Sequence, residues 1–234
     1  MLVIFDCDGV LVDSEIISAK VSSDCLKEIG IELSADYFLE TYRGKSVADC
    51  IAMITAELSR LDDWKSLTAA EQAERGAQFW RRIQLQTLVV CETQLEPVAG
   101  VMAALDSLQE KQIPFCVASN GKHEKMRMTL AKTGIMPYVQ GRVFSFEDVT
   151  RGKPAPDLFL HAAKSLNIPA EQAIVVEDSL TGIQAAVAAG MRPLGYCPPN
   201  SDGSDNVLLE PMRALGAEVF FAMDELIPLI FKNH

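Results

Sequence analysis

Short apolar strands alternate with helices along the second half of the chain, and this alternation most constrains the fold. The strand patterns lie at 113–118, 173–176, 193–196 and 218–221, and helical patterns lie at 122–133, 156–166, 180–189 and 224–231. Continuous apolar runs are typical of strands that are buried on both faces. Their alternation with helices predicts an α/β fold built on a parallel, doubly wound sheet.

A helical block interrupts this alternation directly after the first strand. Helical patterns cover residues 14–27, 35–41, 46–58 and 69–86, with almost no strand pattern between them. We therefore expect two domains. A sheet domain of residues 1–13 and 91–234 would carry a helical domain of residues 14–90 as an insertion.

The first strand ends abruptly at two acidic residues, in the stretch Val-Ile-Phe-Asp-Cys-Asp-Gly-Val that begins at Val3. Residues i and i+2 of an extended chain point to the same side, so Asp6 and Asp8 would lie together. Two neighbouring carboxylates repel each other unless one is protonated or a cation lies between them. The pattern therefore predicts a cation beside Asp6 and Asp8.

Polar residues also follow the other predicted strands. In open parallel sheets, ligands bind at the carboxyl ends of the strands, where these residues would meet. They are Asp6 and Asp8, Ser119 and Asn120, Glu177 and Asp178, and Lys153 in the connection before a helix. Carboxylate oxygens from Asp6, Asp8 and Glu177 or Asp178 suit Mg²⁺, which accepts one or two carboxylates together with substrate phosphate.

A phosphoryl group is the anion that best fits between this cation and the remaining polar groups. Ser119 offers a hydroxyl beside backbone N–H groups ahead of a helix, and Lys153 offers a positive charge. Asp6 would then attack phosphorus as a nucleophile. Asp8 would act as general acid toward the leaving oxygen and as base toward water.

The net charge, the lengths of the apolar runs and the spacing of the cysteines argue against several other classes of function. The formal net charge of −11 disfavours nucleic acid and anionic membranes as partners. No apolar run reaches the roughly 18 residues that a membrane span needs, and the N-terminus has no secretory pattern. The six cysteines are scattered without a C-x-x-C pair, which suits a reducing cytoplasm. We expect a cytoplasmic monomer that binds a small phosphorylated metabolite.

Four motifs resemble those of the haloacid dehalogenase-like hydrolases. They are Asp6-Cys7-Asp8-Gly9-Val10, Ser119-Asn120, Gly152-Lys153-Pro154-Ala155-Pro156-Asp157 and Val176-Glu177-Asp178-Ser179. The resemblance covers the whole chain and implies a Mg²⁺-dependent phosphatase with a Rossmann-like core and an inserted helical cap. It further implies that Asp6, the main-chain carbonyl of Asp8 and Asp178 bind the metal, with Glu177 in or beside this shell. It also implies that Ser119 and Lys153 hold the phosphoryl group, with Asn120 close by.

The segment Arg43-Gly44-Lys45 corresponds to the family's substrate-specificity loop. Its two cations are expected to contact the substrate, and Gly44 would let the backbone bend. The region is similar to that of bacterial sugar-phosphate and 6-phosphogluconate phosphatases.

Three other functions are alternatives to hydrolysis. Haloacid dehalogenase activity is disfavoured by Asp8, because those enzymes lack the second acidic residue. A β-phosphoglucomutase has a histidine at the position of Ser18 and an arginine at that of Val47, so hydrolysis is favoured over phosphoryl transfer within the substrate. A non-catalytic protein that binds a phosphorylated metabolite is the third alternative.

Overall fold

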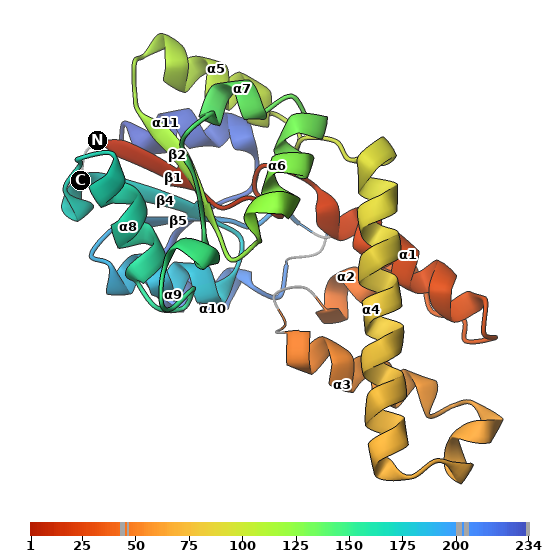
Figure 1. Ribbon diagram of the computed structural model, residues 1–234. Coiled ribbons are helices and arrows are strands. Elements are labelled where there is room, and N and C mark those ends of the chain that lie inside the picture. Colours follow the sequence, from red (N-terminus) through yellow and green to blue (C-terminus); the bar gives the residue numbers. More distant parts are fainter. Residues whose placement is uncertain (43–44, 46, 200–202, 204–205, 233–234) are drawn as a thin grey trace. The chain divides into compact units, whose positions relative to one another are not determined.

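The computed structural model describes residues 1–42, 45, 47–199, 203 and 206–232. Contacts between Cα atoms divide the chain into two compact units, Met1–Asp13 with Leu95–His234, and Ser14–Gln94. We call them the sheet unit and the helical unit. Figure 1 shows the chain coloured from its N-terminus to its C-terminus, with the elements labelled.

The sheet unit contains six parallel strands in the order β3-β2-β1-β4-β5-β6. They are β1 (Leu2–Phe5), β2 (Phe115–Ser119), β3 (Val143–Ser145), β4 (Ala173–Glu177), β5 (Arg192–Tyr196) and β6 (Glu218–Phe220). After β1 the chain builds the sheet outward through β2 and β3, and then returns to the other side of β1 to add β4. The predicted parallel, doubly wound α/β fold is confirmed.

The central position of β1 determines where ligands can bind. Phe5 pairs with Val117 of β2 on one side and with Val176 of β4 on the other. The strand order reverses between β1 and β4, and such a switch point opens a crevice at the carboxyl ends of the strands. The residues that follow β1, β2 and β4 therefore lie at one edge of the sheet.

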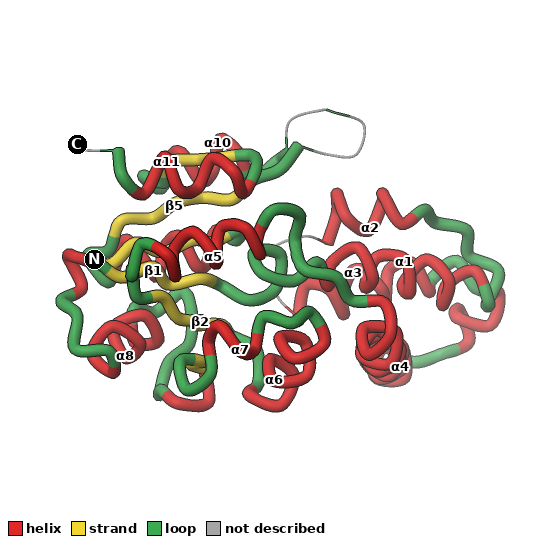
Figure 2. Tube along the Cα trace, turned by 90° about the horizontal axis from the view of Figure 1, so that it is seen from above, coloured by secondary structure: helices red, strands yellow, loops and turns green. Residues whose placement is uncertain are grey.

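Helices lie on both faces of the sheet (Figures 1 and 2). They are α5 (Val101–Glu110), α6 (His123–Lys132), α7 (Met136–Val139), α8 (Asp157–Ser165), α9 (Leu180–Ala188), α10 (Leu209–Ala214) and α11 (Leu226–Ile230). Short 3₁₀ helices lie at Phe146–Asp148, Ala170–Gln172 and Met223–Glu225. The sequence patterns did not predict α7 or α10, which are too short to show a helical period.

The alternation of side chains along β1 separates the two faces. Leu2 and Ile4 are fully buried in one apolar cluster with Leu158 and Phe159 of α8 and Ala185 of α9. Small alanines on α8 and α9 let these helices approach the sheet closely. This packing fixes the strand ends on which the candidate site depends.

The helical unit consists of α1 (Ser14–Lys27), α2 (Ala35–Tyr42), α3 (Val47–Leu58), a 3₁₀ helix (Asp62–Ser66) and α4 (Ala69–Gln94). The long helix α4 packs against both α1 and α3. It continues eight residues beyond Gln86, where the sequence pattern ended, and Cys91 in this extension is buried. Residues 91–94, assigned to the sheet domain from sequence, therefore belong to the helical unit.

The two connections to the helical unit are paired with each other inside the sheet unit. Val12 and Pro97 form an antiparallel bridge. The amide of Asp13 donates to the carbonyl of Glu96 at 3.2 Å, and that of Val98 donates to Leu11 at 3.0 Å. The chain thus leaves and re-enters the sheet unit at one point.

Two expectations about the whole chain can be compared with the described residues. No helix within the described ranges combines the length and the apolar character that a membrane span needs. All six cysteines lie in these ranges, and they are buried and form no disulfide.

Candidate active site

Three strand ends and one loop bring the predicted residues together. Asp6 directly follows β1, Ser119 ends β2 and Glu177 ends β4. Because β1 lies between β2 and β4, these three positions are neighbours at the carboxyl edge of the sheet. Lys153 reaches the same edge from the connection that precedes α8.

The ammonium of Lys153 bridges two buried carboxylates. Its Nζ donates to Asp6 Oδ1 at 2.5 Å and to Glu177 Oε1 at 2.7 Å. The Lys153 side chain is only 2% exposed, and its Nζ lies 4.7 Å from the centre of the Phe159 ring. A lysine buried this deeply is a fixed positive charge in a medium of low dielectric.

Burial and charge act on the two partners in opposite ways. Burial raises the pKa of Asp6 to about 7, because the effects of Glu177 and Asp8 add to desolvation and outweigh the nearby Lys153. Burial alone would lower the pKa of Lys153, but Asp6 and Glu177 raise it above its ordinary value. Lys153 is therefore charged at every physiological pH, whereas Asp6 gains or loses a proton near neutrality.

Glu177 holds Lys153 in place from the side of β4. Its second oxygen, Oε2, accepts from the amide and from the hydroxyl of Ser179, both at 2.8 Å. A Cβ on Gly182, in the first turn of α9, would collide with the Glu177 side chain. Both carboxylate oxygens of Glu177 are thus engaged, and its predicted place in or beside a metal shell stays a prediction.

Asp8 lies in a tight turn after β1 and is paired with a lysine that the sequence did not single out. Gly9 has a φ of 78°, and the amide of Leu11 donates to the carbonyl of Cys7, which turns the chain back. Lys125 Nζ donates to both carboxylate oxygens of Asp8 at 2.8 Å. Nothing in the sequence marks this contact, because the two residues are 117 positions apart.

Asp178 lies against the main chain of the same turn. A Cβ built on Gly9 would collide with the Asp178 carboxylate, so only glycine leaves room for it there. The predicted metal ligands, the side chains of Asp6 and Asp178 and the carbonyl of Asp8, therefore come from two adjacent strand ends. Within the described ranges, no three His, Cys, Asp or Glu side chains form a ready metal cluster.

Ser119 and Asn120 follow β2 but have different contacts. Ser119 is buried, and its Oγ accepts from the amide of Gly121 at 3.1 Å. The side-chain amide of Asn120 donates to the carbonyl of Lys153 at 3.0 Å and accepts from its N–H at 2.9 Å. Asn120 therefore holds the backbone of Lys153, and its predicted proximity to a phosphoryl group stays a prediction.

The predicted specificity loop is described only in part. Arg43 and Gly44 lie outside the described residues. Lys45 is exposed, and its amide donates to the carbonyl of Tyr42 at 3.1 Å. Its expected contact with substrate stays a prediction.

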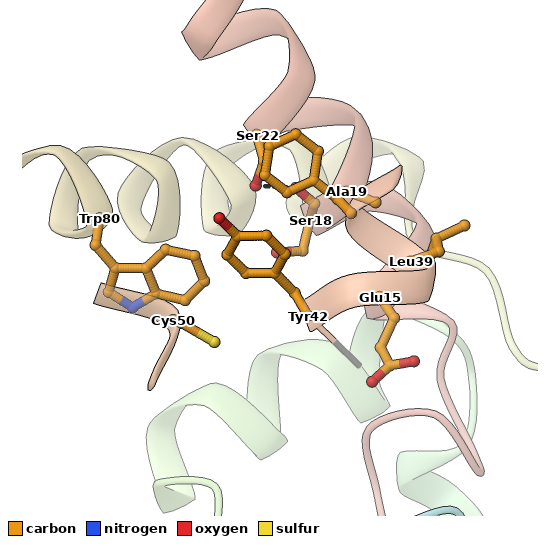
Figure 3. A pocket seen from close by; sticks show the side chains of 9 residues that line it. Glu15, Ser18, Ala19, Ser22, Leu39, Tyr42, Cys50 and Trp80 are labelled. Atoms are coloured by element: carbon orange, nitrogen blue, oxygen red, sulfur yellow. Dashed lines mark hydrogen bonds between the residues drawn. The ribbon is translucent and has the colours of Figure 1, made fainter. Parts of the chain in front are cut away.

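The helical unit has a pocket of its own, with a cavity of about 100 Å³. It is lined by Glu15, Ser18, Ala19, Ser22, Phe38, Leu39, Tyr42, Cys50 and Trp80. Figure 3 shows the Tyr42 ring beside Trp80, with Glu15, Ser18 and Ser22 projecting from α1. The Tyr42 and Trp80 rings stack with their centres 6.3 Å apart.

Two polar atoms of residues that line this pocket are buried without a hydrogen-bond partner among the described residues. They are the hydroxyl of Tyr42 and Nε1 of Trp80. A buried donor without a partner costs free energy, and such groups often pair with a bound molecule or with water. The pocket combines aromatic walls with a few polar groups, as small-molecule sites commonly do.

The sequence of this chain is similar to those of known hydrolases and phosphatases. Residues 1–190 match the family model described as haloacid dehalogenase-like hydrolase. The chain is 32% identical over 195 residues to 6-phosphogluconate phosphatase of Escherichia coli strain K12, covering 83% of this chain and 81% of the relative. It is 28% identical over 198 residues to hexitol phosphatase A of the same organism, covering 84% and 82%.

A solved structure with a similar fold carries phosphate. It is a HAD family hydrolase from Deinococcus radiodurans R1 with bound phosphate and sodium. The TM-score is 0.78 at 27% identity, and the match covers 96% of this chain and 92% of that one. This similarity extends over both units of the chain.

Proposed function

We propose that this chain, which belongs to the haloacid dehalogenase-like hydrolase family, is a Mg²⁺-dependent phosphatase of a small phosphorylated sugar or sugar acid. The observation that carries the proposal is the buried contact between Asp6 and Lys153 at the sheet's switch point. A buried carboxylate beside a fixed ammonium is suited to attack an anionic phosphoryl group, whose oxygens the ammonium attracts. The names of the two relatives described above support a sugar-type substrate.

Asp6 is the proposed nucleophile. Its carboxylate oxygen forms a bond to phosphorus as the bond from phosphorus to the leaving oxygen breaks, which gives an aspartyl phosphate. Lys153 attracts the phosphoryl oxygens, and the Ser119 hydroxyl donates to one of them. Glu177 and Asn120 hold Lys153 in position through its ammonium and its backbone.

Asp8 is the proposed proton donor and acceptor. It gives a proton to the leaving oxygen in the first step and takes one from the attacking water in the second. It lies two residues after Asp6, beyond the end of β1, so both carboxyl groups belong to the same edge of the sheet.

The charges of the site fit a divalent cation. When all are ionised, Asp6, Asp8, Glu177 and Asp178 carry four negative charges, and Lys125 and Lys153 carry two positive ones, which leaves two negative charges. The oxygens of Asp6 and Asp178 and the carbonyl of Asp8 are hard ligands of the kind that Mg²⁺ prefers. When bound, Mg²⁺ would neutralise charge on the phosphoryl group and keep Asp6 ionised.

The helical unit is proposed to select the substrate. Its pocket offers aromatic walls, on which the C–H faces of a sugar can pack, and the hydroxyls of Ser18 and Ser22. The unpartnered Tyr42 hydroxyl and Trp80 Nε1 are suited to pair with hydroxyl groups of a ligand. Arg43, Gly44 and Lys45 are proposed to contribute further contacts to the same ligand.

Phosphate release from a panel of phosphorylated sugars, sugar acids, polyols and nucleotides tests this proposal. We expect turnover with Mg²⁺, none with a chelator, and a loss of at least about a thousandfold for Asp6→Asn. Rapid acid quenching followed by mass spectrometry should find phosphate on the peptide that contains Asp6. Full activity of Asp6→Asn would overturn the nucleophile.

The same assays separate two of the alternatives, the mutase and the non-catalytic protein, from hydrolysis. Isomerisation of glucose 1-phosphate with its bisphosphate activator, without phosphate release, would indicate a mutase. Tight binding of a phosphorylated metabolite without any turnover would indicate a non-catalytic binding protein.

A further inference from the structure

Lys125 is the partner of Asp8 across the sheet edge. Its Nζ lies at the same distance, 2.8 Å, from both carboxylate oxygens. The side chains are 37% and 27% exposed, so the pair is partly shielded from water. A cation that contacts both oxygens restricts the direction in which the carboxylate points.

The start of α6 places Lys125 against Asp8. A Cβ on Gly121 would lie 3.9 Å from Asp8 Oδ2 and 3.5 Å from Ser119 Oγ, so this loop runs directly beside both side chains. The carbonyl of Gly121 accepts from the buried Ser145 hydroxyl at 2.7 Å. The amide of His123, the first residue of α6, donates to Glu147 Oε2 at 2.9 Å. Lys125 therefore extends from a helix start that is fixed on two sides.

Each acidic residue of the first motif has a lysine of its own. The Asp6 carboxylate contacts Lys153, which is buried and also bound by Glu177. Asp8 contacts Lys125, which comes from the first turn of α6. The two carboxyl groups therefore have different environments, and each group can have a separate task.

We propose that Lys125 is a positioning residue, which orients Asp8 for proton transfer to the leaving oxygen; this role rests on the proposed phosphatase function. One Asp8 oxygen stays on the Lys125 ammonium while the other carries the proton. The proton passes to the ester oxygen as its bond to phosphorus breaks and the bond between Asp6 and phosphorus forms. In the second step Asp8 takes a proton from water, whose oxygen bonds to phosphorus as the bond to Asp6 breaks. Lys125 neither gains nor loses a proton.

Two substrates of nearly the same shape separate this role from general damage to the site. Phenyl phosphate has a poor leaving group that needs a proton, whereas the nitro group of p-nitrophenyl phosphate lets its oxygen leave without one. General acid catalysis contributes about 10²- to 10⁴-fold where a proton is needed. We expect Lys125→Met to lower kcat/KM, which reports on the first step and not on hydrolysis of the aspartyl phosphate, by about tenfold or more on phenyl phosphate. On p-nitrophenyl phosphate kcat/KM should change by less than about threefold.

Matched variants complete the experiment. Lys125→Arg keeps the charge and should recover most of the loss on phenyl phosphate. Lys132→Met removes an exposed lysine from the last turn of the same helix and should leave both activities unchanged. Asp8→Asn with Lys125→Met should be no slower than Asp8→Asn alone, because a residue that acts through Asp8 has no effect once Asp8 is disabled.

The outcomes that oppose the proposal are distinct. Equal losses of kcat/KM on both substrates, or a further full loss in the double variant, would mean that Lys125 contacts the substrate independently of Asp8, and would overturn the positioning role alone. No hydrolysis of either substrate by the unaltered protein would overturn the proposed function itself. Thermal unfolding of each variant shows whether a loss of activity reflects a loss of folded protein.

Discussion

The side-chain amide of Asn120 both donates to and accepts from the main chain of Lys153, across 33 positions of sequence. This pair of bonds places the lysine backbone at the edge of the sheet, and Glu177 and Asp6 then hold its ammonium. A cation that must meet a phosphoryl group at a fixed distance is thus constrained at both of its ends. Asn120 acts on the site through Lys153.

Replacing Asn120 with alanine should lower both activity and stability. The two lost hydrogen bonds are partly exposed and are worth about 1 kcal/mol each. We expect kcat/KM on p-nitrophenyl phosphate to fall about tenfold, because a displacement of a catalytic group by about 1 Å can cost more than that. Steady-state kinetics and thermal unfolding measure the two effects.

Asn206 provides the control for Asn120. It is buried and also makes two such bonds, donating to the carbonyl of Pro198 and accepting from the amide of Leu208. Asn206→Ala should cost at least as much stability and leave activity unchanged. A similar loss of activity in both variants would contradict a specific role for Asn120.

Gly182→Ala should be harmful although alanine normally stabilises a helix by about 1 kcal/mol relative to glycine. Gly182 lies in the first turn of α9, and its new Cβ would collide with the Glu177 side chain. Glu177 would move and Lys153 would lose one of its two carboxylate partners. We expect lower Tm and lower kcat, whereas Gln184→Ala on the exposed side of α9 should change neither. An increase in Tm for Gly182→Ala would show that the collision is avoided.

Mg²⁺ binding should weaken below neutral pH. The pKa of Asp6 in the metal-free protein is raised to about 7, so a proton competes with the ion below that pH. We expect the Kd for Mg²⁺, measured by calorimetry, to be about tenfold higher at pH 6 than at pH 8. Asp6→Asn should remove most of this dependence, and equal Kd values at both pH values for the unaltered protein would contradict it.

The same shift predicts how pH affects the stability of the metal-free protein. The folded-state pKa of Asp6 lies above its ordinary value of 3.8. Protonated Asp6 therefore contributes to the free energy of unfolding, and this contribution is complete below pH 3.8. It is lost as pH rises toward 7, where the buried carboxylate becomes charged. Added Mg²⁺ should therefore raise Tm more at pH 8 than at pH 6.

Trp80 should report on ligands that enter the pocket of the helical unit. The chain has two tryptophans, and Trp64 is buried elsewhere in the same unit. In a Trp64→Phe, Asp6→Asn protein, Trp80 is the only tryptophan, so excitation selective for tryptophan reports on it alone, and no turnover is expected. We expect a saturable change in emission with glucitol 6-phosphate or 6-phosphogluconate. A Trp80→Phe, Asp6→Asn protein should show none, and equal changes in both proteins would contradict binding in this pocket.

The strand ends could be predicted because they depend only on the order of apolar runs and the polar residues after them. Parallel strands that are adjacent in the sheet must bring Asp6, Ser119 and Glu177 to one edge, whatever the side-chain details. Lys153 was predicted from its charge in the connection before a helix, although apolar periodicity does not position that loop. The catalytic roles of these residues stay predictions.

The contacts that order the site could not be predicted in this way. A lysine in the first turn of a helix carries no sign of meeting Asp8, because that meeting depends on how α6 packs at the sheet edge. The two-way bond of Asn120 likewise needs the close approach of Gly152, whose Cβ would lie 2.5 Å from Asn120 Oδ1. Both depend on tertiary packing between segments that are distant in the sequence.

The end of α4 shows a different limit. Residues 87–90 include Thr87, Val89 and Val90, whose branched side chains lower helix propensity. The helix nevertheless continues to Gln94, with Cys91 buried. Packing against neighbouring helices stabilises it where local propensity alone predicts an end.

The bridge between Val12 and Pro97 has a consequence for the chain as a whole. The segment that leaves the sheet unit at Val12 and the segment that returns at Pro97 are hydrogen-bonded to each other. The backbone of the sheet unit is therefore continuous in its hydrogen bonding across this junction. The hydrogen bonds of the sheet then set no requirement on the length or composition of the segment inserted between Val12 and Pro97. Evolution can therefore exchange the inserted helical unit for another one, while the strands of the sheet and the acidic residues at their ends keep their register.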